Sequence, residues 1–141
     1  MKAIAFALII IGSAFLFIEK SMAQAIPDPP KLVLFIDGKP FVGDSIPLST
    51  ILQADSLSTN KSWIIIEKAT ITFYGPGVCI GGQGVYTLPL PKGQLTSAVK
   101  KMILQLKGNY YVDFECEQAV RVFGDKISVQ LLSMKILASS K

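Results

Sequence analysis

The chain has 141 residues, a length typical of one domain. Its formal net charge is +4, but the lysines are scattered and Arg121 is the single arginine, which argues against a nucleic-acid-binding surface. There is no histidine, which removes the commonest general base, the Ser–His and Cys–His dyads and most transition-metal sites. We therefore expect a protein that is not an enzyme and holds neither metal nor cofactor.

The N-terminal segment, residues 1–25, has the organisation of a secretory signal peptide. Lys2 supplies a minimal positive region, an apolar run extends from Ala3 to Ile18, and Ala23-Gln24-Ala25 forms a cleavage signature. The alternative is a retained membrane anchor, but the run is shorter than the ~20 apolar residues of a spanning helix. We predict an exported protein, periplasmic or extracellular, with no stable membrane insertion after cleavage. Its charge would be +3, because the leader carries two lysines and one glutamate.

Two cysteines, Cys79 and Cys116, are an even count, which in an exported protein favours a disulfide. Such a bridge would close a long loop and stabilise the fold by about 3–4 kcal/mol in the chain-entropy model. The alternative is two separate buried thiols that pack as small apolar groups. Two cysteines without histidine make a poor zinc site, since structural zinc needs four ligands.

A proline-rich lead-in at residues 26–30 cannot form helix and precedes the folded region, which we place at residues 31–138. Leu32–Ile36 has the composition of a strand. Asp37-Gly38 is a strong two-residue hairpin signal, and Pro40 limits the returning strand to a short edge.

The following segment, residues 43–62, is less regular because polar residues and Pro47 separate its aliphatic residues. We predict a short strand near Ser45–Leu48 and a helical turn around Thr50–Ala54. Ser56–Ser62 reads as a polar loop.

The strongest strand signal is Trp63–Tyr74. Its apolar alternation changes phase at Glu67-Lys68, which predicts a β-bulge there. The next elements are a short strand, a glycine loop, an extended segment and a turn, at Val78–Ile80, Gly81–Gly84, Val85–Leu90 and Pro89–Gly93. The glycine loop lacks the Gly-Lys-Ser/Thr ending and the immediate helix of a phosphate cradle, so we interpret it as a surface loop.

The stretch Gln94–Cys116 changes period from helical spacing to strict alternation. Thr96 can cap the start of a helix with its hydroxyl, and Gly108 can adopt the left-handed conformation that ends it. The pattern predicts a short helix at about Thr96–Lys107 that leads directly into a strand at Tyr110–Cys116.

The C-terminal part predicts further strands. Ala119–Phe123 is a short strand, Gly124-Asp125 turns the chain, and the alternation of Lys126–Ala138 slips once, as at a bulge or a strand switch. Seven to nine short strands and one helix predict a mainly β fold, an antiparallel β-sandwich with one short crossover helix.

Acidic and hydroxyl groups do not form a recognisable catalytic set. Asp113, Glu115 and Glu117 line one side of a strand and its extension, whereas a glycosidase needs two carboxyl groups that face each other across a cleft. We interpret this row as a solvated edge. A Ser–Lys dyad would make the protein a hydrolase, but no serine and lysine are singled out by their spacing.

Three tyrosines, Tyr74, Tyr86 and Tyr111, are candidates for an exposed binding face. The alternative is that they pair across neighbouring strands. Their exposure around a groove would favour an extracellular ligand-binding domain, for example for carbohydrate. A flat surface would favour a protein–protein interaction module.

The order of these signals resembles the C-terminal periplasmic domain of the gliding-motility protein GldM of Bacteroidetes. The most specific part comprises Leu95-Thr96, Ile103, Leu106-Lys107 with Gly108, and the Val112-x-Phe114 strand; the rest lies in glycine and apolar positions between Gly38 and Leu137. The resemblance implies a β-sandwich-like module of the cell envelope that binds protein partners in gliding or type IX secretion. This sequence departs from the GldM plan because it has no shaft domains and carries two cysteines.

Overall fold

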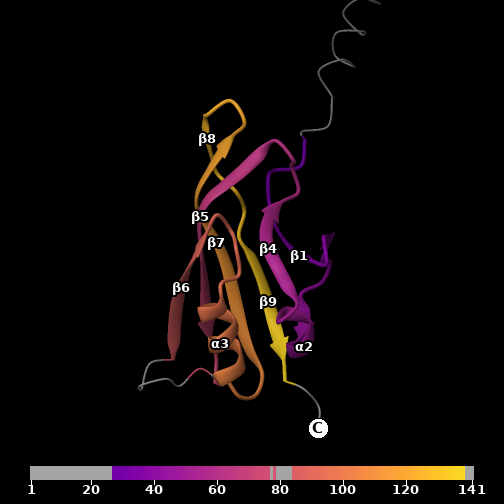
Figure 1. The fold of residues 1–141 in the computed structure, drawn as a ribbon, viewed down its shortest axis with the longest axis vertical. Helices are drawn as coiled ribbons and strands as arrows, with labels where there is room; N and C mark the ends of the chain where they lie inside the picture. The colour runs from indigo at the N-terminus through magenta and orange to yellow at the C-terminus, as the bar shows by residue number, and fades with distance from the viewer. Residues whose placement is uncertain (1–26, 77, 79–83, 139–141) are drawn as a thin grey trace, which may run out of the picture.

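The computed structural model describes residues 27–76, 78 and 84–138, and its fold is mainly β. Nine strands and two helices lie in these ranges (Figure 1). In chain order they are β1 (Leu32–Ile36), β2 (Lys39–Pro40), β3 (Ser45–Pro47), α2 (Leu48–Ile51), β4 (Ala54–Thr59), β5 (Ile64–Tyr74), β6 (Val85–Pro91), α3 (Ser97–Gln105), β7 (Tyr110–Arg121), β8 (Lys126–Ile127) and β9 (Leu132–Leu137).

These strands form two sheets, which confirms the predicted sandwich-like fold. The small sheet has the order β2-β1-β4, and the large sheet has the order β3-β9-β7-β5-β6, with β8 paired to β7. The named strands pair antiparallel except for β3 and β9, which are parallel. Helix α3 carries the chain from β6 across β5 to β7, so it is the predicted crossover. Figure 1 places α2 and α3 near one end of the fold and β8 at the other.

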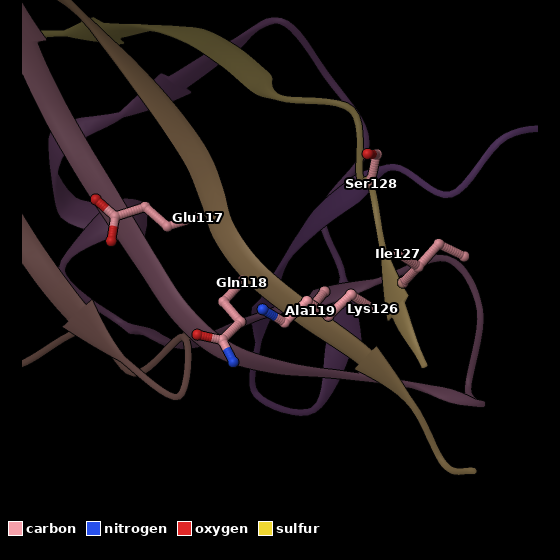
Figure 2. A pocket seen from close by; sticks show the side chains of 6 residues that line it. All are labelled: Glu117, Gln118, Ala119, Lys126, Ile127 and Ser128. Atoms are coloured by element: carbon pink, nitrogen blue, oxygen red, sulfur yellow. The ribbon is translucent and has the colours of Figure 1, made fainter. Parts of the chain in front are cut away.

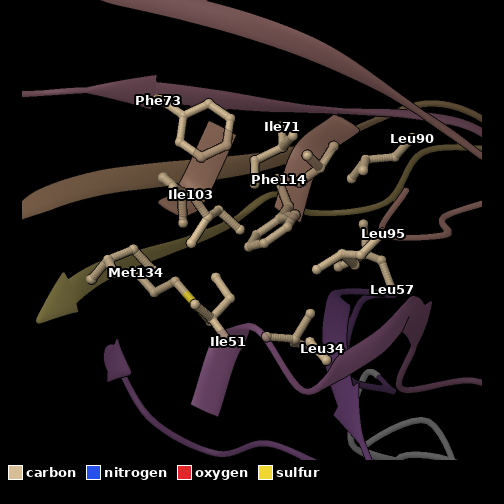
Figure 3. Close-up of a cluster of buried hydrophobic side chains, with 14 of the residues drawn as sticks. Leu34, Ile51, Leu57, Ile71, Phe73, Leu90, Leu95, Ile103, Phe114 and Met134 are labelled. Carbon is tan, nitrogen blue, oxygen red and sulfur yellow. The ribbon is translucent and has the colours of Figure 1, made fainter. Parts of the chain in front are cut away.

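One apolar core joins the two sheets and both helices. Figure 3 shows Ile71 and Phe114 of the large sheet facing Ile103 of α3, Ile51 of α2 and Leu34 of the small sheet. All five side chains are fully buried. The large sheet therefore has one face against this core, while its opposite face carries the alternate residues of each strand.

Helix α3 begins as its sequence predicts, but it ends at Gln105, where Leu106 is already extended, before the predicted end at Lys107 and Gly108. The Thr96 hydroxyl accepts a hydrogen bond from the Val99 amide at 3.4 Å, and Gly108 has a φ of +77° after the helix ends. The helix is anchored to the sheet by Tyr110, whose hydroxyl donates to the Ile103 carbonyl at 3.4 Å. The predicted hairpin at Asp37-Gly38 is also present, since both residues have positive φ.

The β-bulge predicted at Glu67-Lys68 is confirmed by shifts in the pairing of β5 with β7 on both sides of Lys68. The prediction of two separate strands after the helix was wrong, because β7 runs unbroken through Glu117 and Gln118. The ladder skips Glu67 on β5 and then Glu117 on β7, so the two extra residues compensate each other and pairing continues.

Two other expectations need correction. Ser56–Ser62 was expected to be a loop, but its first half belongs to β4, which pairs with β1 and buries Leu57 and Thr59. Pairing with a neighbour overrides the weak strand propensity of the serines. The turn expected at Pro89–Gly93 is confined to Lys92-Gly93, because β6 extends to Pro91.

The other predicted elements are a helical turn, a phase slip near the C-terminus, and the strand and glycine loop after β5. The helical turn lies at Leu48–Ile51, earlier than expected. The phase slip in Lys126–Ala138 marks the break between β8 and β9, which both pair with β7. The strand expected at Val78–Ile80 and the glycine loop Gly81–Gly84 lie mostly outside the described residues; Val78 itself is buried and not in a strand.

Candidate functional site

The candidate site is the outer face of the large sheet, opposite the core. Across its strands, the pairing places Val85, Tyr74, Tyr111, Lys135 and Ser45 side by side in one line. We call these five residues the tyrosine row. Because directly paired residues of a sheet point to the same face, all five side chains project from the outer face.

Tyr111 is the centre of the tyrosine row and is 41% exposed. Its ring stacks on that of Tyr74, with the centroids 5.6 Å apart and the planes inclined by 19°. On the neighbouring strand, the ammonium group of Lys135 lies 6.0 Å from the Tyr111 ring centroid. The Tyr111 ring is therefore flanked by an aromatic ring from β5 and a cation from β9, an arrangement that fixes its position.

A second line of polar residues borders the tyrosine row on the same face. It contains Thr87, Thr72, Asp113 and Ser133, which are paired in that order. The Thr72 and Thr87 hydroxyls lie 3.0 Å apart, and the Tyr74 hydroxyl donates to Asp113 at 3.1 Å. Burial and then the bond to Asp113 raise the pKa of Tyr74, so this phenol stays neutral.

Of the three tyrosines predicted as a binding face, the structure brings two together. Tyr74 and Tyr111 stack, whereas Tyr86 pairs with the fully buried Phe73 and packs half-buried against the core. Tyr86 therefore lies on the opposite face. The predicted alternative, pairing across strands, also describes Tyr74 and Tyr111, which are direct neighbours in the ladder.

Sequence reasoning missed Lys135. The alternation of β9 indicates that the Lys135 side chain points away from the core, because Met134 and Ile136 on either side of it are buried. Its neighbour could not be read from the sequence, because Tyr111 becomes adjacent only when β9 pairs with β7. A hollow next to it is lined by residues of the same area, namely Asp44, Ser45, Tyr111, Ser133, Met134 and Lys135.

The predicted row of carboxylates is divided between two places. Asp113 and Glu115 share the outer face, with Asp113 bound to Tyr74, while Glu117 is the unpaired residue at the bulge. In the described ranges, no group of three acidic, cysteine or histidine residues is positioned to hold a metal ion.

A separate open pocket lies between β7 and the segment that begins with β8 (Figure 2). It is lined by Glu117, Gln118, Ala119, Lys126, Ile127 and Ser128. Figure 2 shows the Ser128 and Lys126 side chains apart from each other, and Gln118 donates to Glu67 outside this group. The pocket thus brings together a serine and a lysine without the contact that a Ser–Lys dyad requires.

Of the two cysteines, the structure describes Cys116. The Cys116 thiol donates to the Lys68 carbonyl at 3.7 Å. Burial raises its pKa, against a smaller lowering by the backbone of Gln118 and a further rise from Glu117. Cys79 lies outside the described residues, so its pairing with Cys116 stays a prediction.

The leader, residues 1–25, is likewise outside the described residues. In the part of the chain that the structure describes, no helix has the length and apolar character needed to span a membrane.

No protein-family model and no curated protein matches the chain.

Proposed function

We propose that this protein is an exported, non-enzymatic module of the cell envelope that binds a protein partner through the tyrosine row. The observation that carries the proposal is the position of Tyr111, which is exposed on a sheet face that no described helix or strand covers and is held between Tyr74 and Lys135. Tyrosine contributes disproportionately to protein interfaces, because it buries a large area at low entropic cost and keeps a hydroxyl for hydrogen bonding.

The arrangement of the rings favours a protein over a carbohydrate. A sugar-binding platform offers a free aromatic ring face. Here the Tyr111 ring has Tyr74 stacked against it and Lys135 beside it, so it offers a partner mainly its edge and hydroxyl. The mixture of threonines, Asp113 and Lys135 supplies hydrogen bonds and both charges around the aromatic pair, as in the polar surroundings of a protein interface.

The edges of the large sheet support binding through its face more than strand addition. Edge strand β6 carries Pro89 and Pro91, which have no backbone N–H to offer an incoming strand. The opposite edge, β3, has three residues and ends at Pro47. A partner that adds a strand therefore finds little edge to pair with, whereas the tyrosine row remains accessible.

The envelope location and the relation to GldM are parts of the same proposal. They rest on the signal-peptide pattern of residues 1–25 and on the resemblance of the region from Gly38 to Leu137. A protein-binding role agrees with what that resemblance implies.

Site-specific photo-crosslinking tests the proposal in cells that produce the protein. A photoreactive amino acid replaces Tyr111 in one variant and Lys101, on the exposed side of α3, in a matched control. We expect a discrete protein adduct from position 111 and none of that size from position 101. Equal adducts from both positions would remove the basis for the site. Binding to a polysaccharide that Tyr111→Ala abolishes would instead establish the carbohydrate-binding alternative.

A further inference from the structure

The β7–β8 turn carries apolar residues where turns normally carry polar ones. The Gly124 amide donates to the Arg121 carbonyl at 2.8 Å, so Val122 and Phe123 are the two central residues of this turn. Their side chains are 60% and 91% exposed. Glycine, asparagine and aspartate dominate such positions because glycine allows positive φ and the short polar side chains bond the nearby backbone. An apolar side chain gains neither advantage there. The fold does not require Phe123 to be aromatic.

Two more exposed apolar residues lie next to this turn. The Val122 amide donates to the Trp63 carbonyl at 3.0 Å, and Ile65 pairs with Val120 on β7. Trp63 is 42% exposed and Ile65 is 51% exposed. We call Trp63, Ile65, Val122 and Phe123 the apolar tip. Figure 1 shows the β8 hairpin at the end of the described fold opposite to α2 and α3.

Basic residues border the apolar tip. The Arg121 guanidinium lies 5.5 Å from the Trp63 ring centroid, and Lys126 pairs with Val120 across the hairpin. Lys61 precedes β5, and its carbonyl accepts a hydrogen bond from the Ile64 amide. Asp125 is the acidic residue of the turn. Three basic residues and one acidic residue thus lie next to the four apolar residues of the tip, along the chain or across a strand pair. Tryptophan beside arginine or lysine at the edge of an apolar surface is typical of segments that anchor at a membrane interface.

We propose that the apolar tip binds the surface of a bilayer that contains anionic lipids. Phe123 and Val122 would reach the boundary of the acyl chains, Trp63 would lie at the level of the headgroups, and Arg121 and Lys126 would face the phosphates. Each basic residue close to an anionic surface strengthens such binding about fivefold. The contact is peripheral and reversible, because a few side chains insert rather than a spanning segment.

Shape and charge favour a lipid surface over a protein for this site. A protein interface is broad and its central apolar residues are ringed by neighbours that exclude water, whereas this tip is the turn of a hairpin with nearly all of Phe123 in solvent. The tip shares no residue with the tyrosine row. A membrane contact here and a protein contact there can therefore be tested and can fail independently.

Fluorescence of Trp63 gives a local test, because it is the only tryptophan in the chain. The protein is titrated with vesicles of phosphatidylcholine alone and with vesicles that also contain phosphatidylglycerol. We expect a blue shift of the emission with the anionic vesicles, little shift with the neutral ones, and loss of the shift in 0.5 M salt, since salt screens the cations. Because the reporter is in the tip, binding through the N-terminal segment does not produce this signal.

Matched substitutions distinguish membrane binding through the apolar tip from nonspecific adsorption to vesicles. Phe123→Ser removes an apolar side chain from the tip without changing charge, and Leu104→Ser does the same at α3, where Leu104 is 62% exposed. We expect Phe123→Ser to weaken partitioning onto anionic vesicles at least about tenfold and Leu104→Ser to change it less than about twofold. Unchanged emission with anionic vesicles, or equal effects of the two substitutions, overturns the proposal. If the protein self-associates without vesicles and Phe123→Ser abolishes this association, the tip is a protein contact. That result also overturns the membrane-binding proposal.

Discussion

Replacing Gly93 by alanine tests a close approach between the turn after β6 and strand β4. Gly93 has a φ of +73°, and its carbonyl accepts a hydrogen bond from the Leu57 amide of β4 at 2.7 Å. A Cβ atom at Gly93 would lie 2.5 Å from the Leu57 carbonyl oxygen. Because that oxygen belongs to the backbone of a strand, it cannot move away as the end of a flexible side chain could.

The loss of folding free energy expected for Gly93→Ala has two parts, which a control variant can separate. A non-glycine residue in the left-handed conformation costs roughly 1 kcal/mol. Relief of the overlap would break the hydrogen bond to Leu57, whose buried amide would then cost a further 1–3 kcal/mol or so. We therefore expect Gly93→Ala to destabilise by about 3 kcal/mol. In Gly108→Ala, φ is also positive, at +77°, but the new Cβ meets no atom within 4 Å, so only the roughly 1 kcal/mol conformational part applies.

Urea unfolding followed by circular dichroism measures both variants. We expect the midpoint of Gly93→Ala to fall clearly below that of Gly108→Ala, by the equivalent of about 2 kcal/mol, with an unchanged m-value. If the two variants lose equal stability, the close packing of the Gly93 turn on β4 is not present in solution, and the placement of the two sheets would be wrong.

The other predictions concern the core, pH and the cysteines. Phe114→Ala empties a fully buried position and should cost about 3–5 kcal/mol in thermal or urea unfolding, whereas Phe123→Ala at the exposed turn should stay within about 0.5 kcal/mol; similar losses would refute the assigned burial. Burial raises the pKa of Tyr110 from 10.0 to about 12, so its contribution to stability is complete below pH 10 and is lost as pH rises toward 12. The alkaline fall in stability should be smaller in Tyr110→Phe, and an identical fall would contradict this reasoning. A thiol assay on denatured, unreduced protein should detect no reactive thiol if Cys79 and Cys116 are paired, and two thiols exclude the bridge.

Local sequence signals located the elements that are set by neighbouring residues. Thr96 marked the start of the helix, Asp37-Gly38 gave the hairpin, and the phase change at Glu67 gave the bulge, because each depends on backbone chemistry within a few positions. The end of the helix was placed too late, because Leu106 is already extended before Gly108 is reached. The strand β4 was missed because its serines have no strand preference of their own. Its pairing with β1 and the contact with Gly93 create it, and both are distant in sequence.

In the candidate site, too, local sequence signals indicated some residues, whereas strand pairing placed the others. Tyr74 and Tyr111 were recognisable as polar-face residues of alternating strands, so the aromatic pair could be suggested. Tyr86 was placed with them because the start of β6 gave no sign of which side chain would face the core; its pairing with Phe73 decides this. Lys135 joins the row only through the pairing of β9 with β7.

The affinity of the purified protein for the partner captured at position 111 tests the central claim most directly. Calorimetric titration compares Tyr111→Ala and Lys135→Glu with Lys101→Glu, which makes the same charge change on the exposed side of α3. We expect Tyr111→Ala to weaken binding by about 2 kcal/mol, roughly thirtyfold in Kd, and Lys135→Glu to weaken it as well, with Lys101→Glu near the unsubstituted protein. An unchanged Kd for Tyr111→Ala in a correctly folded protein would contradict the assignment of the tyrosine row as the binding surface.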